Sequence, residues 1–360
     1  MKVPSKKNKL RIVFLYAELV GYVVNLINFI AEEYDVIIYL IRDDKNLLSK
    51  EIVHVLHQNV FIYDKTKYSE KGSLELFINQ LNPDLLAISG WRDKNYLQVA
   101  KKLKYHIPVI CMSDNKWNNT IRQRVGSIFS FFFCHRYFTH FWVPGPRQYA
   151  FARNMNYLDN QIILNFYTAD TILLNNTYSK SLPNKINKFP HIFLYVGRFS
   201  IEKGCDLLIK AFEELSNDHP NDWKLVLVGN GKLKIPLNNN KIIIKDFMSQ
   251  LELQQIFSRT GVFCMPSYTE QWGVSIHEAA TIGMPLLLSD VCGSIPTFLI
   301  DGYNGYKFKS RNLLHLKERM KLIINTPDHE LVDMGNRSHK LGQRINVEIS
   351  AASLMSIFCD

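Results

Sequence analysis

Short apolar runs alternate with amphipathic stretches along almost the whole chain, and this alternation limits the possible folds most. An apolar run of about five residues is typical of a buried strand, and the amphipathic stretches have the length and period of helices. Strands that alternate with helices form parallel sheets, because a parallel connection needs a crossover. The expected strands are 11–16, 35–41, 60–63, 84–89, 107–112 and 139–143 in the first half, and 191–196, 224–228, 241–244, 262–265 and 285–288 in the second. The expected helices include 22–33, 95–105, 204–217, 249–258, 274–283 and 311–325.

The length of the chain indicates two such domains. Its 360 residues are about twice the typical length of one domain. The polar segment around Asn175, Asn176 and Pro183 is expected to link them. We therefore predict an α/β protein with two Rossmann-like, doubly wound domains facing a cleft. The expected divisions are 1–170 for the first domain, 171–190 for the linker, 191–345 for the second domain and 346–360 for a C-terminal helix that packs back on the first domain.

No segment is expected to cross a membrane. The apolar run from Ile12 to Ala17 follows several lysines, as in a signal peptide, but Glu18 interrupts it and no cleavage site follows, so a strand is expected. No other stretch reaches the roughly 18 uncharged apolar residues of a spanning helix. The six cysteines show no Cys-x-x-Cys spacing, which argues against a zinc site or a disulfide framework. These features favour a cytoplasmic protein with reduced thiols.

The first half carries most of the positive charge. Of the formal net charge of +10, residues 1–165 contribute +8, from 22 Lys and Arg against 14 Asp and Glu. An anionic surface would therefore meet the first half of the chain.

One window of this half contains no carboxylate. Between Asp114 and Asp159 the sequence holds twelve aromatic residues and several cations. Two interpretations stay open. The window is a contact with an anionic membrane, or it is a buried helix and strand whose aromatic side chains belong to the core. No nucleic-acid-binding motif accompanies it, so nucleic acid is not expected as a partner. The candidate membrane residues are Arg122, Arg124, Phe131, Phe132 and Arg136, with Lys116 nearby.

The strongest motif begins where the expected strand 191–196 ends. Gly197 is followed by Arg198 and Lys203, and Gly204 opens the next helix. A glycine turn at a strand end brings the backbone close to a phosphate, and two cations can neutralise its charge. The alternative is a solvated turn with two surface charges.

A second cluster lies in the segment 266–280. Pro266 and Gly273 break any helix there, so Glu270 is expected in a loop and Glu278 in the first turn of the following helix. The amides from Gly273 to Ile276, which include those of Val274 and Ser275, would form a helix N-terminus that accepts an anion. As an alternative, Ser275 and Glu278 have the spacing of a capping box.

Several other chemistries lack their motifs. The sequence has no Asp-x-Asp pair for a metal-bridged diphosphate, and no Gly-x-Ser-x-Gly, P-loop or strict Gly-x-Gly-x-x-Gly motif. Hydrolase, P-loop and dehydrogenase functions therefore lose their main support. No metal and no cofactor are expected.

With these motifs in order, the second half resembles the donor-binding domain of the retaining family 4 glycosyltransferases of GT-B fold. The resemblance implies that Arg198 and Lys203 bind the donor diphosphate, that Glu278 binds the ribose and that Glu270 binds the transferred sugar. It places the loop with Phe247 beside the nucleobase, and Gly197, Gly273, Val274 and Ser275 in the donor site. The matching motifs are Val196-Gly-Arg198, Glu202-Lys203-Gly204, Val228-Gly-Asn-Gly231, Pro266-Ser267, Glu270-x7-Glu278, Gly283-x-Pro285 and Asp301-Gly-Tyr-Asn-Gly305.

The first half is similar, more loosely, to acceptor domains of bacterial surface-polysaccharide enzymes of this family. The resemblance implies acceptor-side roles for Gly21, Trp91 and Asp114. Two departures stand out: the first loop carries only Gly21 where many relatives have a glycine pair, and Asp114 stands where many have histidine. The motifs are Gly21-Tyr22, Ser89-Gly-Trp91, Ser113-Asp-Asn-Lys-Trp117 and Val143-Pro-Gly-Pro-Arg-Gln148.

The resemblance implies transfer of a hexose from a nucleoside-diphosphate sugar to a saccharide or lipid-linked saccharide, with retention of configuration. This reaction would serve cell-surface polysaccharide or lipopolysaccharide synthesis, at the inner face of the cell membrane. Glu270, Arg198, Lys203 and Asp114 would be the catalytic residues. Two alternatives remain: a nucleotide-sugar epimerase of the same fold, and a non-catalytic glycosyltransferase-like membrane subunit.

Overall fold

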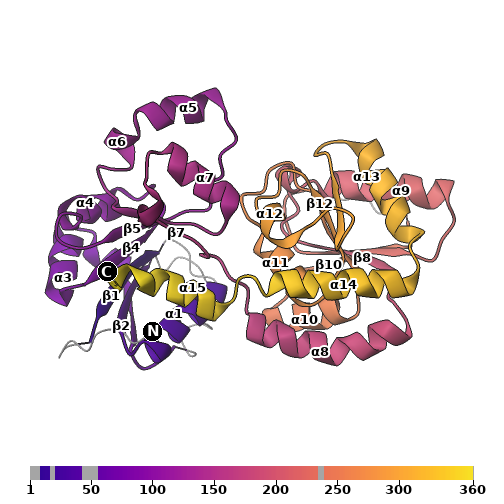
Figure 1. Cartoon of the computed structure of the whole chain (residues 1–360), viewed down its shortest axis with the longest axis horizontal. Coiled ribbons are helices and arrows are strands. Elements are labelled where there is room, and N and C mark those ends of the chain that lie inside the picture. Colours follow the sequence, from indigo (N-terminus) through magenta and orange to yellow (C-terminus); the bar gives the residue numbers. More distant parts are fainter. Residues whose placement is uncertain (1–8, 17–20, 43–55, 234–238, 360) are drawn as a thin grey trace. The chain divides into compact units, whose positions relative to one another are not determined.

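The computed structural model describes residues 9–16, 21–42, 56–233 and 239–359. The chain forms two compact units, which we call the N-terminal unit (Met1–Thr168 with Ile345–Asp360) and the C-terminal unit (Ala169–Arg344). Each contains a parallel β-sheet with helices on both faces (Figure 1). The predicted pair of doubly wound α/β domains is confirmed.

The N-terminal sheet has the strand order β3-β2-β1-β4-β5-β6-β7, and every neighbouring pair is parallel. The sequence did not predict β7, whose two residues are too short to give a recognisable pattern. The strands are β1 (Arg11–Tyr16), β2 (Ile37–Arg42), β3 (Val60–Asp64), β4 (Leu85–Ser89), β5 (Val109–Met112), β6 (His140–Trp142) and β7 (Ile162–Ile163).

Helices cover both faces of this sheet. They are α1 (Gly21–Glu33), α3 (Ser73–Leu81), α4 (Lys94–Leu103), α5 (Ile121–Ile128), α6 (Ser130–Phe133), α7 (Pro146–Asn154) and α15 (Val347–Met355), with short 3-10 helices η2 (Lys65–Tyr68), η3 (Asp159–Gln161) and η5 (Ser356–Phe358).

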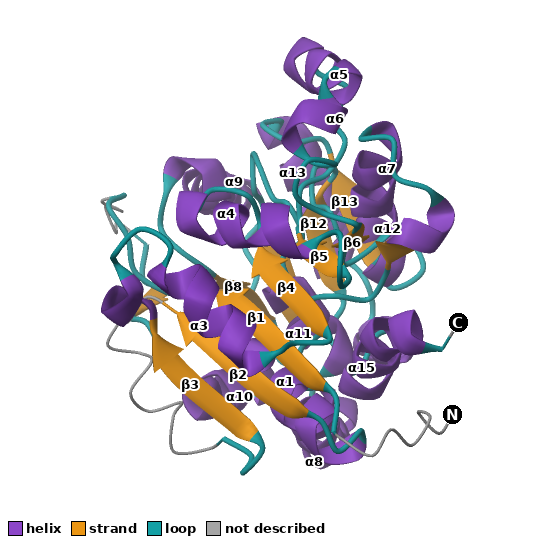
Figure 2. Cartoon of the chain, turned by 90° about the vertical axis from the view of Figure 1, so that its left-hand side faces the viewer, coloured by secondary structure: helices purple, strands orange, loops and turns teal. Residues whose placement is uncertain are grey.

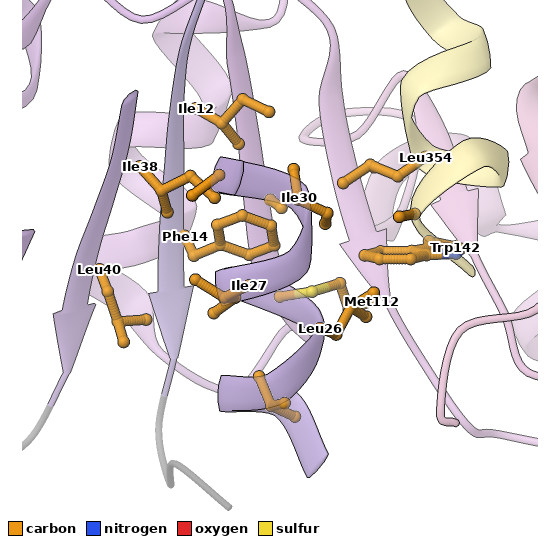
Figure 3. Packing of buried hydrophobic residues seen from close by; sticks show 14 of the residues in the cluster. Ile12, Phe14, Leu26, Ile27, Ile30, Ile38, Leu40, Met112, Trp142 and Leu354 are labelled. Atoms are coloured by element: carbon orange, nitrogen blue, oxygen red, sulfur yellow. The ribbon is translucent and has the colours of Figure 1, made fainter. Parts of the chain in front are cut away.

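Alternate residues of β1 face opposite layers of the core, as a strand buried on both faces requires. Phe14 packs on the side of α1 and α15, whereas Val13 packs on the side of α3, α4 and α7. Figure 3 shows Phe14 among side chains of α1, with Trp142 and Leu354 close together. Because Leu354 is fully buried in this cluster, the end of the chain is part of the N-terminal unit.

The C-terminal sheet has the order β10-β9-β8-β11-β12-β13, again all parallel. The sequence did not predict β13, because a glycine and a lysine interrupt its apolar pattern. The strands are β8 (Ile192–Val196), β9 (Lys224–Val228), β10 (Ile242–Lys245), β11 (Val262–Met265), β12 (Leu286–Ser289) and β13 (Gly305–Phe308). The helices are α8 (Thr171–Asn187), η4 (Ile201–Lys203), α9 (Cys205–Asp218), α10 (Gln250–Ser258), α11 (Val274–Thr281), α12 (Ile295–Phe298), α13 (Leu313–Ile324) and α14 (Asp328–Gly342).

The predicted linker 171–190 is wrong, because most of it forms α8, which packs against α10, α11 and α14. The Asn175 and Gln343 side chains exchange two hydrogen bonds of 3.1 and 2.8 Å. The Tyr178 ring stacks on His339 with 3.7 Å between the ring centroids. These tertiary contacts outweigh the low helix propensity of the asparagines and of Pro183.

The cysteines and the helix lengths bear on two further expectations from the sequence, the absence of disulfides and the absence of membrane-spanning segments. The six cysteines are unpaired thiols, and five of them are buried. Within the described ranges, every helix is too short or too polar to cross a bilayer.

A histidine clamp joins three elements at the amino end of β8. The His191 ring lies 2.8 Å from carboxylate oxygens of both Asp222 and Asp328 and stacks on Trp223. Burial disfavours the imidazolium, but the hydrogen bonds to Asp328 and Asp222 outweigh it, so the pKa of His191 is raised.

We expect this clamp to stabilise the fold below about pH 6.5 and to lose its effect as pH rises through the raised pKa of His191. At pH 6, His191→Gln should lower the free energy of unfolding by up to about 1 kcal/mol, since the clamp is partly exposed. Denaturant unfolding at pH 6 and pH 9 measures this, with the exposed His329→Gln as the control. An equal loss at both pH values would contradict the clamp.

Candidate functional site

The strand order of the C-terminal unit reverses beside β8. The strands β9 and β10 lie on one side of it, and β11, β12 and β13 lie on the other. In open parallel sheets, ligands bind outside the carboxyl ends of the strands at such a switch point. The loops 197–204 and 266–273 follow β8 and β11 directly, so both predicted motif clusters lie at this switch.

Direct backbone contacts join the two loops. The N–H groups of Tyr268 and Thr269 donate to the carbonyl oxygen of Glu202 at 2.8 and 3.2 Å. Gly204 has a φ of +67°, and a Cβ there would lie 2.2 Å from the carbonyl oxygen of Pro266. Only glycine allows this approach, which fixes η4 against the segment that leads to Glu270.

Lys203 and Glu270 form an ion pair at the centre of the site. The Lys203 Nζ lies 2.6 Å from Glu270 Oε2, and the side chains are only 18% and 10% exposed. The Gly293 N–H, beyond the end of β12, donates to the Glu270 carbonyl oxygen at 3.2 Å. Glu270 is therefore held by its own loop after β11 and by contacts from the loops after β8 and β12.

Arg198 and Phe247 present exposed side chains after β8 and β10. The Arg198 carbonyl oxygen accepts a hydrogen bond of 2.8 Å from the Tyr195 hydroxyl, which fixes the turn while the guanidinium stays exposed. Phe247 is 60% exposed. An exposed guanidinium can bind an anion, and an exposed aromatic ring can stack on a flat ring of a ligand.

The N-terminus of α11 lies in the same segment. Gly273 is its N-cap, with a φ of +89°, and Val274 and Ser275 are the first two helical residues. The first amides of a helix have no partner within the helix, so they can donate to an anion.

Two expectations for Glu278 are wrong. Ser275 lies inside the helix and the N-cap makes no side-chain hydrogen bond, so no capping box forms. Glu278 is the fifth helical residue, beyond the first turn. The glycine at position 273 starts the helix two residues earlier than a serine cap would.

The Glu278 side chain is buried and has a partner that the sequence analysis missed. Gln250 Nε2 donates to Glu278 Oε1 at 2.9 Å. Burial raises the pKa of Glu278 despite this hydrogen bond. Gln250 opens α10 directly after the loop 245–248, and Ser249 and Glu252 form a capping box there. That capping signal could have pointed to Gln250.

The predicted acceptor-side residues lie at the carboxyl edge of the N-terminal sheet. Trp91 follows β4 and stacks on Phe151 with 6.1 Å between ring centroids. Asp114 follows β5, is half-buried and interacts electrostatically with Tyr16 and Tyr167. Gly21 opens α1, where a Cβ would meet open space.

Three tyrosines that were not predicted as site residues, Tyr16, Tyr22 and Tyr167, lie around Asp114. Tyr16 ends β1, and Tyr22 and Tyr167 meet edge to face at 5.5 Å. Burial, together with the nearby Tyr167 and Asp114, raises the pKa of Tyr16. Hydroxyl and aromatic groups beside a carboxylate are suited to a saccharide. The signal was available, since Tyr16 and Tyr22 are only six residues apart in the sequence.

The aromatic and basic window divides into two parts. Phe138 is buried and Lys116 is only 5% exposed, so Lys116 is not a surface cation as expected. The core interpretation therefore holds for Phe138, whereas other aromatic residues of the window lie at the surface. The exposed aromatic residues are Phe129, Phe131, Phe132 and Phe133.

Among the residues that the structure describes, no group of three or more His, Cys, Asp or Glu side chains is arranged to hold a metal ion.

Residues 180–341 match the family "Glycosyl transferases group 1", a segment that contains Arg198, Lys203, Glu270 and Glu278. The chain is 24% identical over 192 residues to an uncharacterised glycosyltransferase of Haemophilus influenzae, covering 52% of each chain. It is 28% identical over 181 residues to another of Methanocaldococcus jannaschii, covering 48% of each. The chain thus matches about half the length of these curated relatives.

Similarity to a solved structure extends over nearly the whole chain. The crystal structure of Anabaena HepE in complex with UDP-glucose superimposes with a TM-score of 0.72 at 16% identity, over 98% of this chain and 100% of that one. The predicted GT-B fold is confirmed, and residues 180–341 match the glycosyltransferase group 1 family.

Proposed function

We propose that the protein is a retaining glycosyltransferase that moves a hexose from a nucleoside-diphosphate sugar to a saccharide or lipid-linked saccharide. The observation that carries this proposal is the Lys203–Glu270 ion pair at the strand switch of the glycosyltransferase group 1 domain. A cation for the diphosphate and a carboxylate for the sugar are already in contact there. The HepE complex supports a nucleotide sugar as the donor.

The nucleoside diphosphate is the leaving group, and its negative charge determines which stabilising groups the site needs. As the bond between the sugar C1 and the phosphate oxygen breaks, negative charge grows on the diphosphate. Arg198 and Lys203 would stabilise this charge, and the first amides of α11 would add to it. An ammonium has three donors, so Lys203 can bind a phosphate oxygen while keeping Glu270.

The acceptor oxygen would form its bond to C1 on the same face, and its proton would pass to the leaving phosphate oxygen. Bonds and charges then balance without a strong protein base. Glu270 would orient the sugar, and Glu278, held by Gln250, would bind the ribose. Asp114 would orient the acceptor.

The acceptor proposal extends to cell-surface polysaccharide synthesis. A lipid-linked saccharide is presented at a membrane, so the protein would act at the inner face of the cell membrane. The positive charge of the first half of the chain favours such a surface.

A panel of nucleotide sugars, beginning with UDP-glucose, tests the proposal. Thermal shift identifies the donor, because a ligand at 100 times its Kd stabilises by about 2.7 kcal/mol. Product analysis with acceptor saccharides follows, with and without EDTA, since no metal is proposed. An epimerised donor without transfer would indicate an epimerase, and binding without any product a non-catalytic subunit.

Glu278→Gln separates nucleotide binding from stability. We expect the variant to bind the nucleotide about tenfold more weakly, because it loses a charge-assisted hydrogen bond. The raised pKa of Glu278 costs the parent protein stability as pH rises above about 4.3, so the variant should unfold at the same temperature or higher at pH 7. Calorimetric binding and melting curves measure both effects. A variant that melts lower but binds normally would remove the ribose assignment.

A further inference from the structure

We propose that α5 and α6 form a membrane-binding surface that inserts apolar side chains into an anionic bilayer. This inference rests on the membrane location proposed above, and it specifies which residues make the contact. The α5–α6 surface consists of the exposed Ile121, Val125, Ile128, Phe129, Phe131, Phe132 and Phe133, together with Arg122, Arg124 and Arg136.

The apolar side of α5 faces solvent. Ile121, Val125 and Ile128 recur at the spacing of one helical stripe, yet Ile121 and Ile128 are 81% and 74% exposed. None of the residues of α5 is buried. In a soluble protein the apolar stripe of a helix normally packs against the core. The exposed stripe of α5 therefore indicates an apolar binding partner outside the unit.

The phenylalanines of α6 extend the same apolar surface. Phe131, Phe132 and Phe133 are between 62% and 70% exposed. Figure 2 shows α5 and α6 projecting beyond the N-terminal sheet, next to α7. A projecting pair of short helices can enter a bilayer interface without burying the sheet.

Hydrogen bonds hold this projection against the end of α7. The Asn156 Nδ2 donates to the Ser127 carbonyl oxygen at 3.0 Å and to Ser130 Oγ at 2.8 Å. The His135 ring lies between Phe131 and Tyr157, with centroid distances of 4.5 and 4.1 Å. The exposed phenylalanines are therefore presented on an ordered support, which reduces the entropy lost on insertion.

The positive charge of the α5–α6 surface indicates which partner binds it. Arg122, Arg124 and Arg136 are exposed, and no carboxylate occurs in the sequence between Asp114 and Asp159. Cations beside exposed aromatic side chains are suited to anionic lipid headgroups above acyl chains. A symmetric contact with a second copy would instead bring arginines against arginines. We therefore infer a lipid surface.

Co-sedimentation of the full chain with vesicles tests the inference. We expect binding to mixed phosphatidylglycerol–phosphatidylcholine vesicles, weaker binding in high salt and little binding to pure phosphatidylcholine. Phe131→Ser/Phe132→Ser and, separately, Arg122→Gln/Arg124→Gln/Arg136→Gln should each weaken binding about tenfold. Phe132→Trp should show a blue shift of its emission on the mixed vesicles, which electrostatic contact alone would not produce.

Matched controls are available in the same unit. Leu76→Ser/Tyr105→Ser removes two exposed apolar side chains, and Lys67→Gln/Lys71→Gln/Lys101→Gln removes three exposed charges. These controls should bind as the parent does. Equal loss in the controls, unchanged binding in the α5–α6 variants, or a dimer in solution that the α5–α6 variants dissolve would overturn the inference.

The outcome is independent of catalysis. Transfer to a water-soluble acceptor without vesicles should be the same in the α5–α6 variants as in the parent. If the parent binds vesicles but transfers nothing, the glycosyltransferase proposal fails while the membrane surface stands. If the parent transfers the sugar but does not bind vesicles, the membrane-surface inference fails while the glycosyltransferase proposal stands.

Discussion

Replacing Lys203 or Arg198 with alanine is expected to lower glycosyl transfer about a hundredfold in each case. Each change removes a cation that would face a diphosphate whose charge grows as the glycosidic bond breaks, a loss on the order of 3 kcal/mol. Initial rates with the donor identified by thermal shift measure this. Lys232→Ala, which removes an exposed lysine of the same unit, is the control.

The two variants should differ in stability. Arg198 is exposed, so its loss should leave the melting temperature unchanged. Lys203→Ala removes one charged partner of the mostly buried Glu270 carboxylate, which should cost about 1 to 3 kcal/mol of unfolding free energy. Adding Glu270→Gln to Lys203→Ala should restore much of that stability without restoring transfer. Near-normal turnover in both single variants would refute the donor-site assignment.

Gly204→Ala is expected to destabilise the protein by about 2 to 4 kcal/mol and to disrupt the donor site. The left-handed backbone costs an alanine about 1 to 2 kcal/mol. In addition, its Cβ would lie 2.2 Å from the Pro266 carbonyl oxygen, so η4 and the loop before Glu270 would have to separate. Denaturant unfolding and transfer rates measure the two effects.

Gly302→Ala is the matched control for this substitution. Gly302 has a φ of +76°, but a Cβ there would meet nothing within 4 Å. The control therefore measures the backbone cost alone and should keep its activity. Equal losses in the two variants would show that the approach of Gly204 to Pro266 contributes nothing.

The order of the main elements was predictable from the sequence. The pattern of β1 predicted its observed bounds, and those of β8 and α11 were each predicted within two residues. Strands buried on both faces are short continuous apolar runs, which depend little on the rest of the fold. The pattern failed for β7, with only two residues, and for α8, whose helix depends on partners in α11 and α14.

The sequence predicted which residues lie at the candidate site, but it did not predict the contacts between them. Arg198, Lys203, Glu270 and Gly273 follow strand ends, and the carboxyl ends of parallel strands share one edge of a sheet. The sequence could not show that Lys203 pairs with Glu270, that Gln250 binds Glu278, or that Gly273 replaces a serine cap. These features depend on distances between loops that are far apart in the chain.

The two parallel sheets and the residue types at their edges could be predicted from the sequence, because hydrophobic periodicity and glycine–cation spacing are local properties. The division of the aromatic side chains between Asp114 and Asp159 into core and surface became visible in the folded chain. Phe138 packs against the sheet, whereas Phe131 and Phe132 face solvent, although all three lie within one aromatic-rich segment of eight residues. Burial is decided by what the rest of the chain places against a side chain, and no local pattern contains that information.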